Sequence, residues 1–173
     1  MEPNFEVWLS NNRGMVAGSH RKGHNVFTNT GRDWLRYLIS YKGIGPDLTN
    51  PLGADDPHET GRIRWIGVGD GIQAAHADVV GLANPLQVNA SDWWKPLPAP
   101  VFVTETALRY QVSFGPAEIP AGGNISEFAL TKGDGPTTPA ATDPDHSILF
   151  YMTIPPLGPK AGNTLTLRWE LRF

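Results

Sequence analysis

The last ten residues of the chain carry its clearest pattern of alternating apolar and polar positions. Between Thr164 and Phe173, leucine or an aromatic residue occupies every second position, and threonine, arginine and glutamate fill the positions between them. Successive side chains of a strand point to opposite faces, so this alternation predicts a strand with one face in the core and the other in water or against a partner. Residues 108–114 repeat the pattern.

Five further segments are rich enough in β-branched and aromatic residues to be predicted as strands. They are residues 6–9, 62–68, 101–106, 125–131 and 148–154. Together with the two alternating segments they make seven expected strands.

One helix is predicted, at about residues 31–41. The Thr30 hydroxyl can accept a hydrogen bond from the backbone N–H of residue 33, and the Asp33 carboxylate can reach back toward residue 30, which is the arrangement of a helix cap. Apolar residues recur at intervals of three and four between Trp34 and Ile39, so one face of this helix is expected to dock on the rest of the protein.

The connections between these elements are rich in glycine and proline. They cover residues 43–61, 70–100, 115–124, 132–147 and 155–163, and the first two are longer than loops in compact domains usually are. The pattern favours an antiparallel β-sandwich or jelly-roll-like domain with one short helix. We expect an extended N-terminal arm over residues 1–26 and a single domain over 27–173, with the arm and residues 70–100 lying against other subunits.

Composition narrows the classes of function. The net charge of −3 and the pI near 5.9 argue against a dedicated nucleic-acid-binding protein, although Arg21 and Lys22 form a small basic patch that could contact a partner. The chain has no cysteine, which excludes disulfides and thiol chemistry. No apolar run approaches the length of a membrane span, and the polar N-terminus does not resemble a signal peptide, so we expect a soluble protein made in the cytoplasm, with no membrane partner.

The residues indicate no catalytic centre, metal site or cofactor. The five histidines are scattered, and the acidic residues at 55–59 and 143–145 lack the spacing of a calcium loop. No serine lies in a nucleophile elbow, and nothing sets the separation of Asp70 and Glu127, the two carboxylates nearest to expected strands. We therefore predict a protein that is not an enzyme.

A glycine-rich stretch follows the expected strand at 62–68. Gly67, Gly69, Asp70 and Gly71 lack the spacing of a dinucleotide-binding loop, and no clear helix follows them. We predict instead a tight structural turn whose residues tolerate positive φ.

Trp93 and Trp94 form the local feature most typical of recognition. Adjacent residues of an extended segment face opposite sides, so at most one of the two rings would then be core and the other could stack on a sugar or fill a protein groove. The alternative is that both rings cover the core from a wrapping loop.

The order of these signals resembles a family of small virion proteins of tailed bacteriophages, which are tail, neck or fibre-associated components. The family pattern has four parts, and this chain matches them in order. The matching residues are Asn25, Phe27, Thr28, Asn29, Gly31, Arg32 and Leu35; then Trp65, Ile66, Val68, Gly69, Asp70 and Gly71; then Ala74, Ala75, Asp78 and Leu82; and finally residues 110–114 and 125–130, with Ile125 and Glu127 as its "I-x-E" element.

The resemblance implies a structural role in the virion and no catalysis. Its expected partners are other copies of the chain and neighbouring virion proteins. Alternatives left open are a capsid decoration protein and a carbohydrate-binding module of a receptor-binding fibre, for which host surface polysaccharide would be the ligand and Trp93 or Trp94 the stacking platform.

Overall fold

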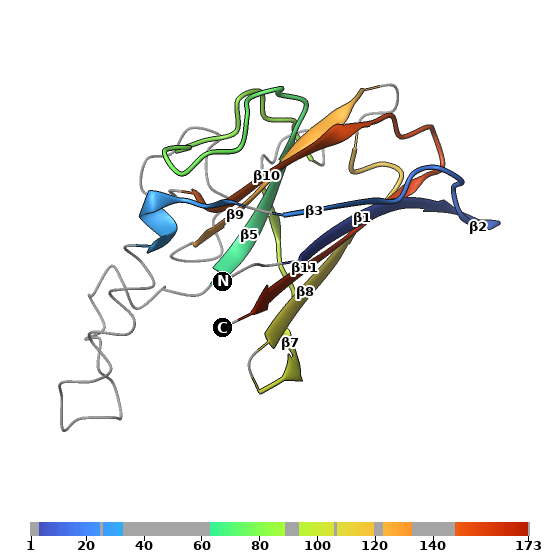
Figure 1. The fold of residues 1–173 in the computed structure, drawn as a ribbon. Helices are drawn as coiled ribbons and strands as arrows, with labels where there is room; N and C mark the ends of the chain where they lie inside the picture. The colour runs from blue at the N-terminus through green and yellow to red at the C-terminus, as the bar shows by residue number, and fades with distance from the viewer. Residues whose placement is uncertain are drawn as a thin grey trace, which may run out of the picture.

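The computed structural model describes residues 4–24, 26–32, 63–88, 94–105, 107–119, 123–132 and 148–172. Eleven strands lie in these ranges: β1 (Asn4–Asn11), β2 (Gly14–Met15), β3 (Arg21–His24), β4 (Val26–Phe27), β5 (Ile63–Gly69), β6 (Trp94–Pro96), β7 (Val101–Thr104), β8 (Ala107–Phe114), β9 (Ile125–Lys132), β10 (Ile148–Leu157) and β11 (Thr164–Arg172). They form two antiparallel sheets that pack as layers (Figure 1).

The first sheet has six strands in the order β2-β1-β11-β8-β7, with β3 also paired to β1. Its centre is β11, which pairs with β1 on one side and with β8 on the other. In this register Val7, Leu167 and Val112 lie side by side across three strands, so their side chains share the inner face.

The second sheet has five strands in the order β4-β10-β9-β5-β6. The residues of β9 from Ile125 to Thr131 are all buried, including those that face away from the other sheet. A strand covered on both faces is expected to be apolar at successive positions, and residues 148–152 of β10 follow this pattern, whereas β9 departs from it at Ser126 and Glu127.

Aromatic rings fill the space between the sheets. Phe5 packs edge-on against Trp169 at 5.0 Å between ring centroids and lies 5.2 Å from Phe128 of the opposite sheet. Phe150 stacks on Phe27 at 4.7 Å. These rings lie in one core to which both sheets contribute, so both sheets belong to the same folding unit.

The predicted fold class is confirmed. The protein is mainly β, with two antiparallel sheets packed as a sandwich, and each of the seven expected strands is present. The strands β2, β3, β4 and β6, each two to four residues long, were not predicted, because so few residues carry no readable alternation.

The prediction of an extended N-terminal arm over residues 1–26 is wrong for its described part. β1 pairs with both β11 and β3, and Phe5, Val7 and Leu9 are buried in the core. The β-branched and aromatic residues of 6–9 identified a strand, but sequence separation hid its partner, which lies about 160 residues away at the other end of the chain.

The helix begins earlier than predicted. Residues 29–32 are helical, and Thr28 caps them: its hydroxyl accepts a hydrogen bond from the Gly31 N–H at 3.0 Å, and its carbonyl accepts one from the Arg32 N–H at 2.9 Å. Thr30 therefore lies inside the first turn. Asp33 and the rest of the predicted helix at 31–41 lie outside the described residues.

Candidate functional site

A buried glutamate on β9 organises the outer face of the five-stranded sheet. Glu127 is 0% exposed, and both of its carboxylate oxygens accept hydrogen bonds. Oε1 accepts from the N–H groups of Gly71 at 3.1 Å and Asn84 at 2.8 Å, and Oε2 accepts from the Ala83 N–H at 3.0 Å and the Tyr151 hydroxyl at 2.6 Å. We call this group of residues the Glu127 anchor.

Four donors satisfy this carboxylate without a cation among its hydrogen-bond partners. A buried charge is tolerated only when it is paired or well hydrogen-bonded, and hydrogen bonds to an ionised acceptor are about twice as strong as neutral ones. Burial raises the pKa of the Tyr151 hydroxyl, and the hydrogen bond to Glu127 and its charge raise that pKa further, so the phenol remains a proton donor. The arrangement holds backbone in place and leaves no oxygen of Glu127 without a hydrogen bond.

The Glu127 anchor fastens residues 70–88, which we call the 70–88 loop, to the end of β5. Ser126 strengthens the attachment by donating its hydroxyl to the Gly71 carbonyl at 2.7 Å. The Asp70 N–H donates to the Asn84 carbonyl at 3.0 Å, and the Asn84 side-chain amide donates to the Asp70 carboxylate. The loop therefore leaves β5 and returns to the same point.

The glycines of this stretch make room for close contacts. A Cβ on Gly67 would lie 2.6 Å from the Trp94 ring, one on Gly69 would lie 2.6 Å from the Asn84 carbonyl oxygen, and one on Gly71 would lie 2.5 Å from Glu127 Oε1. The described glycines with positive φ are Gly14, Gly18 and Gly162. The predicted turn is therefore a structural element, but its expected reason was wrong: these glycines are needed for space and not for positive φ.

The start of the helix is tied to the same region. The Thr28 hydroxyl donates to the Ile148 carbonyl at 2.5 Å, which joins the helix cap to β10. Asn29 contacts the 70–88 loop twice, through its N–H to the Ala77 carbonyl at 2.7 Å and through its side-chain amide to Asp78 Oδ1 at 2.6 Å. Helix start, loop and sheet are thus joined by hydrogen bonds from side chains that lie far apart in the sequence.

The 70–88 loop has a buried side and an exposed side. Val79 and Leu82 pack with Trp65, Trp94 and Tyr151 on the outer face of the five-stranded sheet. Ile72 is 93% exposed and Val80 is 77% exposed. The loop therefore covers its own sheet and still displays apolar side chains to the surroundings.

The predicted recognition role of Trp94 is not supported. Its side chain is 3% exposed and belongs to the cluster under the 70–88 loop. A strand partner explains this, because Trp94 pairs with Gly67, whose missing side chain leaves room for the indole ring. Trp93 lies outside the described residues.

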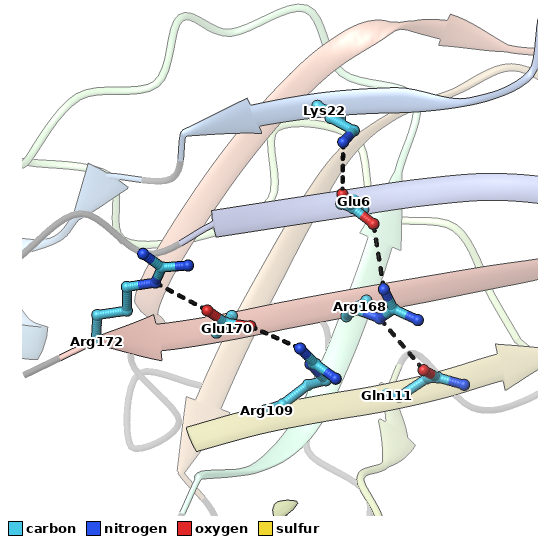
Figure 2. A network of polar contacts seen from close by, with 7 residues as sticks. All are labelled: Glu6, Lys22, Arg109, Gln111, Arg168, Glu170 and Arg172. Atoms are coloured by element: carbon cyan, nitrogen blue, oxygen red, sulfur yellow. Dashed lines mark hydrogen bonds and ion pairs between the residues drawn. The ribbon is translucent and has the colours of Figure 1, made fainter. Parts of the chain in front are cut away.

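The outer face of the six-stranded sheet is a ladder of ion pairs (Figure 2). Glu6 of β1 lies between Lys22 of β3, at 2.9 Å, and Arg168 of β11, at 3.4 Å. Glu170 lies between Arg109 at 3.0 Å and Arg172 at 2.8 Å. The carboxylates are more buried than the cations around them, so the basic groups form the outermost layer of this face.

The cations of the ladder lower the pKa of both carboxyl groups. The hydrogen bond from Lys22 is the largest cause for Glu6, and the hydrogen bond from Arg109 is the largest cause for Glu170. The predicted basic patch is divided between two roles: Lys22 belongs to the ladder, and Arg21 donates to the backbone carbonyls of Gly18 and His20.

Sequence reasoning missed the anchoring role of Glu127, although a signal was present. A glutamate in the otherwise uncharged and mostly apolar segment from Ile125 to Leu130 is unusual, because charged residues are almost never fully buried unless they are paired. Asn84 and Tyr151 gave no comparable signal, because their relation to Glu127 exists only in the folded chain.

Within the part of the chain that the structure describes, no group of three or more histidine or acidic residues is arranged to hold a metal ion. Nor does any helix in those ranges have the length and apolar character needed to cross a membrane. Comparison of the chain with protein-family models, with curated proteins and with solved structures found no match.

Proposed function

We propose that this protein is a non-enzymatic structural component of a tailed-phage virion, located in the tail, the neck or the fibre attachment, and that it acts through contacts between subunits. The observation that carries this proposal is the convergence of the motif residues. Asn29 bonds to Asp78, and Glu127 bonds to Gly71 beside Asp70. At least one residue of each of the four motifs thus belongs to one connected structure around the 70–88 loop.

The nature of these contacts supports an architectural role. The polar motif side chains Thr28, Asn29, Asp70, Asp78 and Glu127 all hydrogen-bond within the chain, and the glycines provide space for that bonding. A catalytic site needs a group held ready for a substrate, whereas here the polar groups are already occupied. The result is a rigid base beneath a loop that exposes Ile72 and Val80, which suits a protein whose task is contact with neighbours.

The expected site of subunit contact is narrower than the sequence suggested. Residues 4–24 and much of residues 70–100 are already packed within their own chain, so they do not need neighbours to be ordered. Among the large apolar side chains of these segments, Ile72 and Val80 of the 70–88 loop remain the most exposed and are available for contact. In the carbohydrate-binding alternative, Trp94 cannot stack on a sugar, because its ring is in the core.

The protein composition and the morphology of purified phage particles test this proposal. Phages that carry this gene should contain the protein in several copies after density-gradient purification, and particles made without it should lack a tail, neck or fibre attachment. Recombinant protein carrying a mass label, added to the lysate before purification, controls for adventitious association. The proposal fails if the unlabelled protein is absent from particles, or if the labelled protein is recovered in equal proportion.

A further inference from the structure

The six-stranded sheet ends at β7, and this edge differs from every other sheet edge among the described residues. Val101 is 64% exposed, Phe102 78% and Val103 38%, so three consecutive large apolar residues face solvent (Figure 1 shows β7 at the lower end of its sheet). No described strand pairs with the side of β7 that faces away from β8. Exposed apolar edge strands invite pairing with another strand, and proteins normally protect them.

The remaining edges carry the usual protection. The strands β2 and β4 are two residues long, β6 ends at Pro96, and β3 carries Arg21 and Lys22. Short length, proline and charge each discourage the addition of a strand. The edge at β7 is also short, but residues 101–103 carry neither proline nor charge, and their apolar side chains are exposed. This edge is therefore the one among the described strands best suited to cover by an apolar partner.

We propose that β7 pairs with β7 of a second copy of this chain, antiparallel and about a two-fold axis near Phe102. Every strand pair in the sheet is antiparallel, and a two-fold axis continues that alternation from one copy into the next. The register between β7 and β8 is regular at Val101 and Phe102 and shifts before Thr104, while Pro98 and Pro100 precede the strand. The regular part of the edge is therefore short and ends at Phe102, and the irregularity falls at Val103.

Charge favours a second copy in this orientation. Residues 101–104 carry no charge, Glu105 follows them and is exposed, and Arg109 lies beside Val101 at the other end of the edge. An antiparallel copy brings the Glu105 end of one chain to the Arg109 end of the other, with Cα atoms roughly 10–12 Å apart for strands spaced about 4.8 Å. A parallel copy would place the two Glu105 residues together.

The edge is too small to give a tight dimer by itself. Stable interfaces bury about 1,200–2,000 Å² in total, which three residues on each side cannot supply. We therefore expect weak, concentration-dependent pairing in solution. This inference concerns the isolated chain and does not depend on the virion role, so the two can fail separately.

Disulfide trapping tests the geometry. The chain has no cysteine, so a single substitution introduces the only thiol. Equivalent residues near the axis of an antiparallel pair have Cα atoms about 4.5–5.5 Å apart, within the range that a disulfide spans. Phe102→Cys, the residue on the axis, should form a covalent dimer under mild oxidation much faster than Met15→Cys, which places an exposed thiol at the opposite edge of the same sheet.

Sedimentation equilibrium tests the energetics. Phe102→Lys should weaken the dimer about tenfold or more, as loss of a central apolar contact does, while Ile72→Lys, an equally drastic change of an exposed apolar residue, should leave it unchanged. Circular dichroism confirms that each variant is folded. Self-pairing is overturned if the cysteine at 102 reacts no faster than the one at 15, if Ile72→Lys rather than Phe102→Lys abolishes the dimer, or if β7 becomes protected only when a different protein is added.

Discussion

The outer faces of the two sheets differ in their exposure to solvent and in the groups that pair with their acidic residues. The five-stranded sheet is covered on its outer face by the 70–88 loop and Trp94, and its acidic residue Glu127 is satisfied by backbone N–H groups and a tyrosine in a dry environment. The six-stranded sheet leaves its outer face in water, and its acidic residues Glu6 and Glu170 are satisfied by lysine and arginine side chains.

The difference shows that glutamates within one domain can contribute very different amounts to the free energy of unfolding. Exposed ion pairs contribute little, because water competes for both charges and the side chains must be ordered. A carboxylate in a dry site cannot be removed without leaving its donors unpaired. The five-stranded sheet should therefore tolerate far less change on its outer face than the six-stranded sheet.

The largest effect is expected for Glu127→Ala. The change leaves three backbone N–H groups and the Tyr151 hydroxyl without their acceptor, and each unsatisfied buried group costs about 1–3 kcal/mol, so we expect a loss of at least about 3 kcal/mol of the free energy of unfolding. Urea denaturation followed by tryptophan fluorescence measures it.

The matched control for Glu127→Ala is Glu6→Ala, which removes a glutamate from the outer face of the other sheet. Its ion partners Lys22 and Arg168 remain hydrated, so the cost should stay within about 1 kcal/mol. Equal losses for the two variants would show that the outer faces do not differ in the way described.

An intermediate effect is expected for Gly69→Ala, which tests the space between the five-stranded sheet and its covering loop. A Cβ there would clash with the Glu127 carboxylate and the Asn84 carbonyl, and overpacking of this kind costs about 1–3 kcal/mol. Thermal unfolding measures the change.

Gly81→Ala, in the same loop, is the control for Gly69→Ala. A Cβ at that position would meet nothing within 4 Å, and replacing glycine by alanine at a compatible position stabilises by about 0.4–1 kcal/mol. If both variants unfold at the same temperature, the close approach at Gly69 is not under steric constraint.

The smallest effects are expected from pH, with acid pH acting on the carboxylates Glu6 and Glu170 and alkaline pH acting on the buried tyrosines Tyr110 and Tyr151. The folded-state pKa values of Glu6 and Glu170 are lowered, so their contribution is complete above the ordinary value of 4.5 and is lost as pH falls through the lowered values. Burial raises the pKa of Tyr110 to about 12 and also raises that of Tyr151, so stability should fall as pH rises above 10.

Two conservative variants test which side chain causes the loss of stability at each end of the pH profile. Glu6→Gln should flatten the decline of the unfolding free energy at acid pH, and Tyr151→Phe should flatten it at alkaline pH. If Tyr151→Phe leaves the alkaline limb unchanged, the Tyr151 hydroxyl does not titrate in the way that its burial and its bond to Glu127 require.

The sequence by itself determined the fold class, because the side-chain period of a strand is local. The alternation at residues 108–114 and 164–172 identified β8 and β11 and the face of each that is buried. The β-branched and aromatic residues at 125–131 and 148–154 likewise identified β9 and β10. The existence of a helix near residue 31 was also readable, although its cap at Thr28 was placed two residues too late.

The tertiary structure decided which segments meet. Nothing local in the sequence indicates that β1 pairs with β11, that the 70–88 loop covers its own sheet, or that Trp94 fills the space above Gly67. Glu127 was visible as an unusual charge in an apolar strand, but its four donors come from three separate segments. Such contacts depend on pairing over long sequence distances, so they arise only when the whole chain has folded.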